Sequence, residues 1–141
     1  MSDPYLGRTF GNVVLEAKIG QGGMGMVYRG RHTRMDKTVA VKLLPPQHND
    51  DKGHYQKRFL REGRTSAAIQ HRHVVQVMDA GKDGDIAYLV LEYVQGHNLG
   101  EILDRDGAMP PAEAERLALG IAEGLGAIHG KGVVHRDIKP D

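Results

Sequence analysis

The chain has 141 residues, with 19 Lys and Arg against 18 Asp and Glu, and it contains no cysteine. This length suits one domain with a hydrophobic core, and the formal charge of +1 excludes a strongly basic surface for nucleic acid. The lack of cysteine excludes disulfides and cysteine-ligated zinc, and it fits a reducing, cytoplasmic location.

The first half of the sequence predicts a sheet of five strands and one helix. Three strands are expected in VVLEAKI, MVYRGRH and KTVAVKLL, which are rich in β-branched and aromatic residues. Residues 54–70 predict a helix, although Gly63 weakens it by about 1 kcal/mol relative to alanine. Two further strands, VVQVMDA and IAYLVLEY, are joined by an Asp-Gly pair that favours a tight hairpin.

The second half predicts helices. LGEILDRD is expected to be a short helix, and Pro110 and Pro111 suit the start of a longer one over residues 111–130. Apolar residues recur in that helix at intervals of three and four, which indicates one buried face. The longest apolar stretch of the chain, at residues 86–94, is far shorter than the roughly 20 residues of a membrane span, so no membrane contact is expected from this segment.

The stretch IGQGGMGMV places Gly20, Gly22 and Gly25 in GxGxxG spacing. Glycines let backbone N–H groups approach phosphate oxygens, although the same glycines could simply form a flexible hairpin turn. A dinucleotide-binding loop would require a helix after the glycines, whereas MVYRGRH predicts a strand. The glycines are therefore expected to join two antiparallel strands, either as a phosphate-binding turn or as a plain hairpin turn.

The stretch VAVK ends in Lys42, and strand alternation places this lysine on the same face as Ala40. An inward lysine needs an anionic partner, and Glu62 of the next helix could supply one. Either residue alone would more often be an ordinary surface charge. The histidines at His71 and His73 lack the cysteines or His-Glu spacing of a zinc site, so no metal ligand is expected.

The order GxGxxGxV, VAVK, helix glutamate, LEYV and HRDIKP resembles the protein-kinase family, in particular its bacterial serine/threonine branch. The resemblance extends from about Phe10 to Asp141 and implies an α+β fold. Residues 1–94 would form the kinase N-lobe, with a five-stranded antiparallel sheet, one long helix and the hinge. Residues 95–141 would begin the C-lobe and run through the catalytic loop.

The resemblance also implies a site for ATP and Mg²⁺. In it, Lys42 and Glu62 would form a pair that orients the α- and β-phosphates. The adenine would lie under Ile19, Val27 and Ala40, beside Leu91 as gatekeeper and the backbone of Glu92 and Val94, with Asn98 as a ribose contact. The phosphates would be covered by the residues of the glycine-rich loop, namely Gly20, Gln21, Gly22, Gly23 and Gly25.

HRDIKPD carries the catalytic part of the resemblance. Asp137 would be the base that accepts the proton of a substrate Ser or Thr hydroxyl, and Lys139 would steady the γ-phosphate. His135 would be structural, and Arg136 would pair with a phosphorylated activation loop.

The sequence stops before the catalytic-loop asparagine and the DFG motif, which carry the magnesium ligands of the family. We therefore expect this stretch to bind ATP weakly, to lack kinase activity alone, and to self-associate through the apolar stripe of its last helix. The resemblance leaves open a C-terminal membrane anchor in a longer parent protein. The alternative function is a non-catalytic module that binds a nucleotide or a partner.

Overall fold

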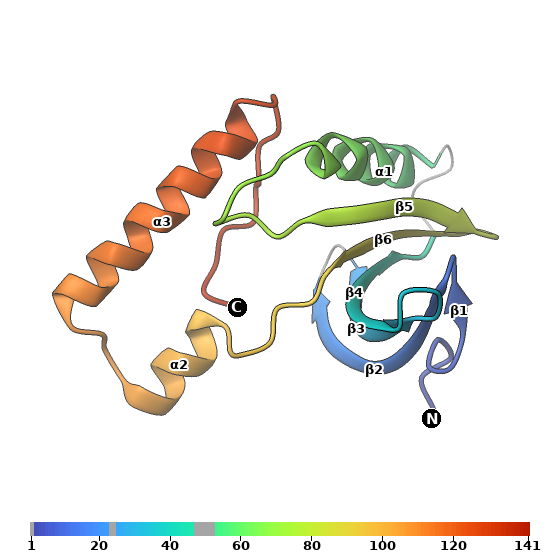
Figure 1. Ribbon diagram of the computed structural model, residues 1–141, viewed down its shortest axis with the longest axis horizontal. Helices are drawn as coiled ribbons and strands as arrows, with labels where there is room; N and C mark the ends of the chain where they lie inside the picture. The colour runs from blue at the N-terminus through green and yellow to red at the C-terminus, as the bar shows by residue number, and fades with distance from the viewer. Residues whose placement is uncertain (1, 23–24, 47–52) are drawn as a thin grey trace. The chain divides into compact units, whose positions relative to one another are not determined.

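The computed structural model describes residues 2–22, 25–46 and 53–141. The chain divides into two compact units. The first comprises Met1–Ala68 and Gln76–Tyr93 and contains the β-sheet with its helix. The second comprises Ile69–Val75 and Val94–Asp141 and contains two further helices and the C-terminal segment (Figure 1).

The first unit contains one antiparallel sheet with the strand order β1-β2-β3-β4-β6-β5. Its strands are β1 (Thr9–Phe10), β2 (Val13–Gly22), β3 (Gly25–His32), β4 (Lys37–Leu44), β5 (Val77–Asp83) and β6 (Ile86–Glu92). The sheet thus has six strands, where the sequence predicts five. The added strand β1 is only two residues long and pairs with the start of β2 across Gly11, which adopts a φ of 59°.

Strand β5 starts three residues after the predicted start at Val74. Val74 instead donates its N–H to the carbonyl of His71 in a turn, and Gln76 binds the Glu92 side chain and backbone. At its other end β5 continues to Asp83, and Asp83 pairs with Ile86. The tight Asp-Gly hairpin is confirmed, with Gly84 at a φ of 56°.

One face of the sheet forms the hydrophobic core together with the N-terminal segment. Tyr28 is fully buried in it, and its hydroxyl donates to Asp3 Oδ2 at 2.8 Å. The ring of Tyr5 packs edge-on against Tyr28 at 6.3 Å between centroids, and Phe10 packs edge-on against Tyr88 at 5.8 Å. The buried cluster consists of Phe10, Val13, Leu15, Tyr28, Val39, Val41, Leu43, Ile86, Tyr88 and Val90.

Helix α1 (His54–Ala67) packs against β5 and β6 (Figure 1). Gly63 is buried against Leu89, whose side chain points away from the core cluster because residues alternate along a strand. The side chain of Gln56 is also buried, and its Nε2 donates to the carbonyls of Leu44 at 2.9 Å and Asp85 at 2.5 Å. These two bonds fasten the first turn of α1 to the sheet.

The second unit contains α2 (Leu99–Asp106) and α3 (Pro111–His129), close to their predicted bounds. Proline at the first position of α3 has no N–H to leave unpaired there. Ile121, which belongs to the apolar stripe of α3, is 41% exposed, and Leu119, outside the stripe, is 61% exposed. Among the helices of the described residues, none is long and apolar enough to cross a membrane.

Candidate active site

The register of the sheet gathers several of the expected site residues on one face. Gly20 pairs with Val27, Val27 with Lys42, and Lys42 with Leu89. Residues directly opposite in antiparallel strands project to the same face, so these four form one row across β2, β3, β4 and β6. Two positions further along β4 and β6, a second row contains Ala40 and its partner Leu91.

The glycine-rich turn connects β2 and β3, whose last pair is Gly22 with Gly25. Gly25 has a φ of 132°, and a Cβ there would collide with the carbonyl oxygen of Leu43, so the backbone requires glycine. A Cβ on Gly22 would have no atom within 4 Å, which shows that this part of the turn borders open space. Gly23, also expected in the loop, lies outside the described residues.

The structure does not bring Ile19 into the row. The register between β2 and β3 shifts between Lys18 and Gly20, so Ile19 has no partner in the ladder and its side chain is 49% exposed. Such a bulge leaves one residue unpaired and changes the direction of its side chain. Gln21, the next expected loop residue, is exposed and accepts a hydrogen bond from Lys18 Nζ at 2.6 Å.

The expected pair between Lys42 and Glu62 is not formed. Glu62 Oε1 instead accepts a hydrogen bond from Arg58 Nε at 3.0 Å, one turn earlier in α1. Within the described part of the chain, no ion pair joins Lys42 to Glu62. Residues four apart on a helix are neighbours, so Arg58 and Glu62 can pair along α1.

The expected hinge residues begin at the end of β6. The backbone N–H of Glu92 donates to the carbonyl of Gln76 at 2.9 Å, and Glu92 Oε2 accepts from the N–H of Gln76 at 3.0 Å. The Glu92 N–H is therefore engaged within the protein, which leaves its carbonyl oxygen as the group that could meet a ligand. Val94 belongs to the second unit and is 62% exposed.

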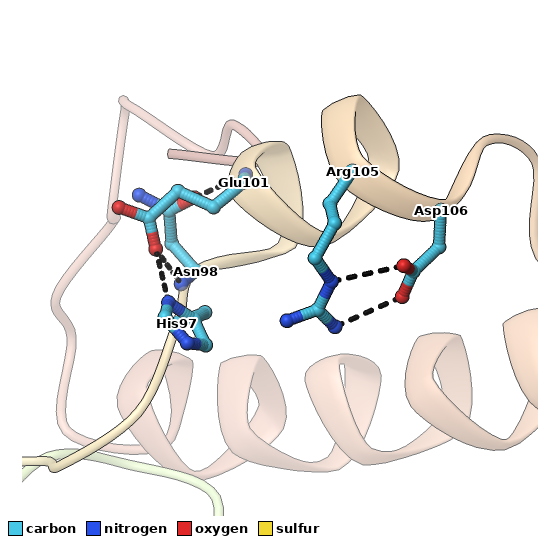
Figure 2. A network of polar contacts seen from close by, with 5 residues as sticks. All are labelled: His97, Asn98, Glu101, Arg105 and Asp106. Carbon is cyan, nitrogen blue, oxygen red and sulfur yellow. Dashed lines mark hydrogen bonds and ion pairs between the residues drawn. The ribbon is translucent and has the colours of Figure 1, made fainter.

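Asn98 is the N-cap of α2, a role that the sequence analysis missed. Figure 2 shows its side-chain oxygen accepting from the N–H of Glu101 at 2.8 Å, while Glu101 Oε2 accepts from the N–H of Asn98 at 3.1 Å and lies 3.3 Å from His97 Nδ1. The available signal was the Asn-x-x-Glu spacing of a capping box. The capping box uses the Asn98 side-chain oxygen as an acceptor, and the amide nitrogen remains as a donor that could contact a ribose.

At the other end of α2, Arg105 donates two hydrogen bonds of 2.9 Å to the neighbouring Asp106 (Figure 2). This bidentate contact lowers the pKa of the Asp106 carboxyl and raises that of the Arg105 guanidinium. Because the pair is exposed and adjacent in sequence, it is a surface feature of α2.

The catalytic-loop residues lie in the C-terminal segment of the second unit. Lys139 Nζ lies 3.4 Å from Asp137 Oδ2, and the Asp137 N–H donates to His135 Nδ1 at 3.2 Å. The Asp137 side chain is 67% exposed, and Arg136 adopts a φ of 67°. The segment therefore presents an accessible carboxylate beside an ammonium group.

Two contacts hold the end of this segment against α2. The N–H of Gly100 donates to the carbonyl of Pro140 at 2.9 Å. A Cβ on Gly100 would lie 2.7 Å from Asp141 Oδ1, so the glycine permits this close approach. In the described residues there is no group of three His, Cys, Asp or Glu side chains that could hold a metal ion.

A family model described as "Protein kinase domain" matches residues 13–141. The chain belongs to the protein kinase family. The matched region contains both rows of the sheet, the glycine-rich turn and HRDIKPD. The kinase fold expected from the sequence motifs is thereby confirmed.

The chain is similar in sequence to bacterial proteins named as serine/threonine-protein kinases. It is 44% identical over 123 residues to the Myxococcus xanthus serine/threonine-protein kinase pkn2, covering 87% of this chain and 15% of that protein. It is 40% identical over 130 residues to the probable serine/threonine-protein kinase PknB of Corynebacterium glutamicum, covering 89% and 20% respectively. The chain thus spans a small part of the length of these relatives.

The crystal structure of the M. tuberculosis PknI kinase domain shares the fold. It superposes with a TM-score of 0.80 at 29% identity, covering 95% of this chain and 54% of that chain. The likeness to bacterial kinases is therefore found in both sequence and structure.

Proposed function

We propose that the chain supplies the nucleotide-binding and catalytic-loop residues of a serine/threonine protein kinase. Its reaction transfers the γ-phosphoryl group of ATP to a Ser or Thr hydroxyl of a protein substrate. The observation that carries the proposal is the register row that places Gly20, Val27 and Lys42 side by side, with Ala40 and Leu91 in the next row. Residues 1–94 would be the N-lobe, and residues 95–141 would begin the C-lobe.

The two rows fit the parts of a nucleotide. Val27, Ala40 and Leu91 supply an apolar surface for a flat base, and burial of such surface contributes roughly 25 cal/mol per Å². Lys42 adds one positive charge on the same face, where it would neutralise the α- and β-phosphates. The turn at Gly22 borders open space, so its backbone can approach phosphate oxygens.

The catalytic loop supplies the proton acceptor. Asp137 would take the proton of the substrate hydroxyl. The hydroxyl oxygen would form a bond to the γ-phosphorus while the bond between the γ-phosphorus and the β-phosphate oxygen breaks, which releases ADP. Lys139, whose ammonium lies 3.4 Å from Asp137, would balance the negative charge of the transferred group. Removing such a base typically costs about 10²–10⁴-fold in rate.

The family generally uses Mg²⁺, which when bound would neutralise the charge of the ATP phosphates. The described residues offer no cluster of metal ligands, so we assign none of them to magnesium. Glu62 is assigned to Lys42 in this proposal, which requires it to leave Arg58, its partner in this structure.

Nucleotide binding tests the first part of the proposal. Calorimetry with ATP should show that Lys42→Met weakens binding about tenfold or more, equivalent to about 1.4 kcal/mol. The matched control is Lys37→Met, which removes an exposed lysine from the same strand outside both rows. Equal affinities for both variants would exclude the assigned role of Lys42.

Phosphoryl transfer tests the second part. In the intact protein, Asp137→Asn should lower turnover by about 10²-fold or more and leave ATP affinity unchanged, because the residue acts on the acceptor hydroxyl. Near-normal turnover would contradict the assignment. If ATP binds but the intact wild-type protein transfers no phosphoryl group, the alternative of a non-catalytic nucleotide-binding module is favoured. The partner of Glu62 in this structure is compatible with that alternative.

Two further parts of the proposal concern association and location. We propose that copies of the chain associate through the apolar stripe of α3, formed by Leu117, Ile121, Leu125 and Ile128, in which Ile121 is 41% exposed. Light scattering should show a smaller mass for Ile121→Ser than for wild type. A cytoplasmic location is also proposed, and the sequence without cysteine is compatible with a reducing compartment.

A further inference from the structure

The N-terminal segment is attached to the sheet through the carboxylate of Asp3. Asp3 Oδ1 accepts from the N–H of Tyr5 at 2.9 Å, and Oδ2 accepts from the Tyr28 hydroxyl at 2.8 Å. The Asp3 side chain is only 18% exposed, and Tyr28 is fully buried. The carboxylate is therefore held in a fixed position on the face of the sheet that contains the core.

Lys18 connects this carboxylate to the glycine-rich turn. Its Nζ lies 3.9 Å from Asp3 Oδ2 and donates to Gln21 Oε1 at 2.6 Å. Lys18 pairs in register with Tyr28, so the lysine and the tyrosine project to the same face as Asp3. A single ammonium group thus contacts the N-terminal segment and the end of β2, next to the glycine-rich turn.

The backbone ladder is irregular where this side-chain contact occurs. The pairing of β2 with β3 shifts between Lys18 and Gly20, immediately before the turn. A bulge interrupts the ladder and bends the strand just before the turn. The contact from Lys18 to Gln21 spans this irregular position.

We propose that Asp3 and Lys18 are positioning residues that hold the glycine-rich turn through Gln21. Asp3 fixes the Lys18 ammonium, and Lys18 fixes Gln21, so the N-terminal segment limits the motion of the two strand ends, residues 20–22 and 25–26, that flank the turn. The consequence for nucleotide affinity rests on the proposed function. The positioning itself is a property of the protein without nucleotide, and it can be measured without one.

Hydrogen exchange on the 141-residue chain tests the proposal. Asp3→Asn keeps an oxygen acceptor for Tyr5 and Tyr28 but removes the charge that faces Lys18. Lys18→Met removes the ammonium. Each variant should speed amide exchange at residues 20–22 and 25–26 by about threefold or more, the size expected from loss of one side-chain hydrogen bond. Exchange in β4 and β6 should remain as in wild type.

The matched control is Arg8→Met. Arg8 Nη2 contacts Asp83 Oδ2 at 3.1 Å, so it holds the same N-terminal segment to the end of β5 without contacting the turn. This variant should leave exchange at the turn unchanged. Lys18→Arg retains the charge and the donors, and it should restore most of the protection.

Two results would overturn the proposal: unchanged exchange at the turn in both Asp3→Asn and Lys18→Met, or the same increase in Arg8→Met. The second result would show a general loosening of the segment. ATP titrations of the same proteins then separate the positioning role of Asp3 and Lys18 from the proposed nucleotide-binding function. If wild type binds no ATP, the proposed function fails, whereas the exchange result still decides the positioning role.

Discussion

Gly63 of α1 and Leu89 of β6 are in direct contact, with no room for a side chain on the glycine. A Cβ on Gly63 would overlap Leu89 Cδ2 and lie 3.1 Å from Cδ1. Leu89 is also the cross-strand partner of Lys42. Gly63 therefore sets how closely α1 approaches β6, the strand that contains Leu89. Glycine lowers the helix propensity of α1, and this close packing offsets that loss.

Gly63→Ala should destabilise the protein despite the better helix propensity of alanine. The gain in propensity is about 1 kcal/mol, whereas forcing an extra methyl group into a packed site costs about 1–3 kcal/mol. We expect a net loss of up to about 2 kcal/mol in the free energy of unfolding by urea. The control is Gly126→Ala in α3, where a Cβ has no atom within 4 Å and a gain is expected. A stabilised Gly63→Ala protein would refute the packing role.

Asn98→Ala should fray the first turn of α2. The variant loses the side-chain acceptor for the Glu101 N–H, and loss of an N-cap costs about 0.5–2 kcal/mol. In an eight-residue helix, that loss should raise amide exchange throughout α2. Asn98→Asp keeps the acceptor and serves as the control. Unchanged exchange in Asn98→Ala would show that the capping box does not support the helix.

The sequence correctly predicts those helices and strands whose ends are determined by neighbouring residues. Strand β4 begins at Lys37 and ends at Leu44 as predicted, because β-branched residues are bounded by a polar turn and a proline. The start of β5 is not predictable in this way, because the contacts between Gln76 and Glu92 join residues far apart in sequence. Local propensity contains no information about such a contact.

In the candidate site, too, local features are predictable from the sequence, whereas features that depend on distant contacts are not. Strand alternation correctly places Lys42 and Ala40 on one face, since this needs only the period of a strand. The bulge at Ile19 depends on the register with β3, and the partner of Glu62 depends on where α1 packs. A sequence motif identifies residue types at a given spacing. It does not show whether Glu62 pairs with Arg58 or with Lys42.

Stability at alkaline pH should depend on Tyr28. Burial raises the pKa of this phenol, and the hydrogen bond and charge of Asp3 raise it further. Because folding raises this pKa, the contribution of Tyr28 to stability is complete below about pH 10, the pKa of a tyrosine in the unfolded chain. This contribution is lost as the pH rises above that value. The free energy of unfolding should therefore fall above about pH 10, and less steeply in Tyr28→Phe. Equal slopes in the two proteins would contradict this account. Burial also raises the pKa of Tyr88, so Tyr88→Phe provides a comparison.

In the second unit, His73 packs closely against two glycines of α3. A Cβ on Gly124 would lie 2.7 Å from the backbone oxygen of His73, and a Cβ on Gly120 would lie 3.3 Å from its ring. The ring is also near Glu123, with 3.5 Å between Nε2 and Oε2. The glycines that reduce the helix propensity of α3 thus permit the segment at His73 to pack closely on it.

Gly124→Ala should displace this segment, whereas Gly120→Ala should be tolerated better. The backbone oxygen that faces Gly124 can move only with the chain, so the overlap should cost about 1–3 kcal/mol against a propensity gain of about 1 kcal/mol. The His73 ring that faces Gly120 can rotate, which relieves most of its closer contact. Amide exchange in residues 71–75 and the NMR shifts of the His73 ring distinguish the two cases. Gly126→Ala, on the same helix with open space around it, shows the effect of propensity alone. If Gly124→Ala matched Gly126→Ala in both measurements, the close approach of His73 to α3 would not contribute to the fold.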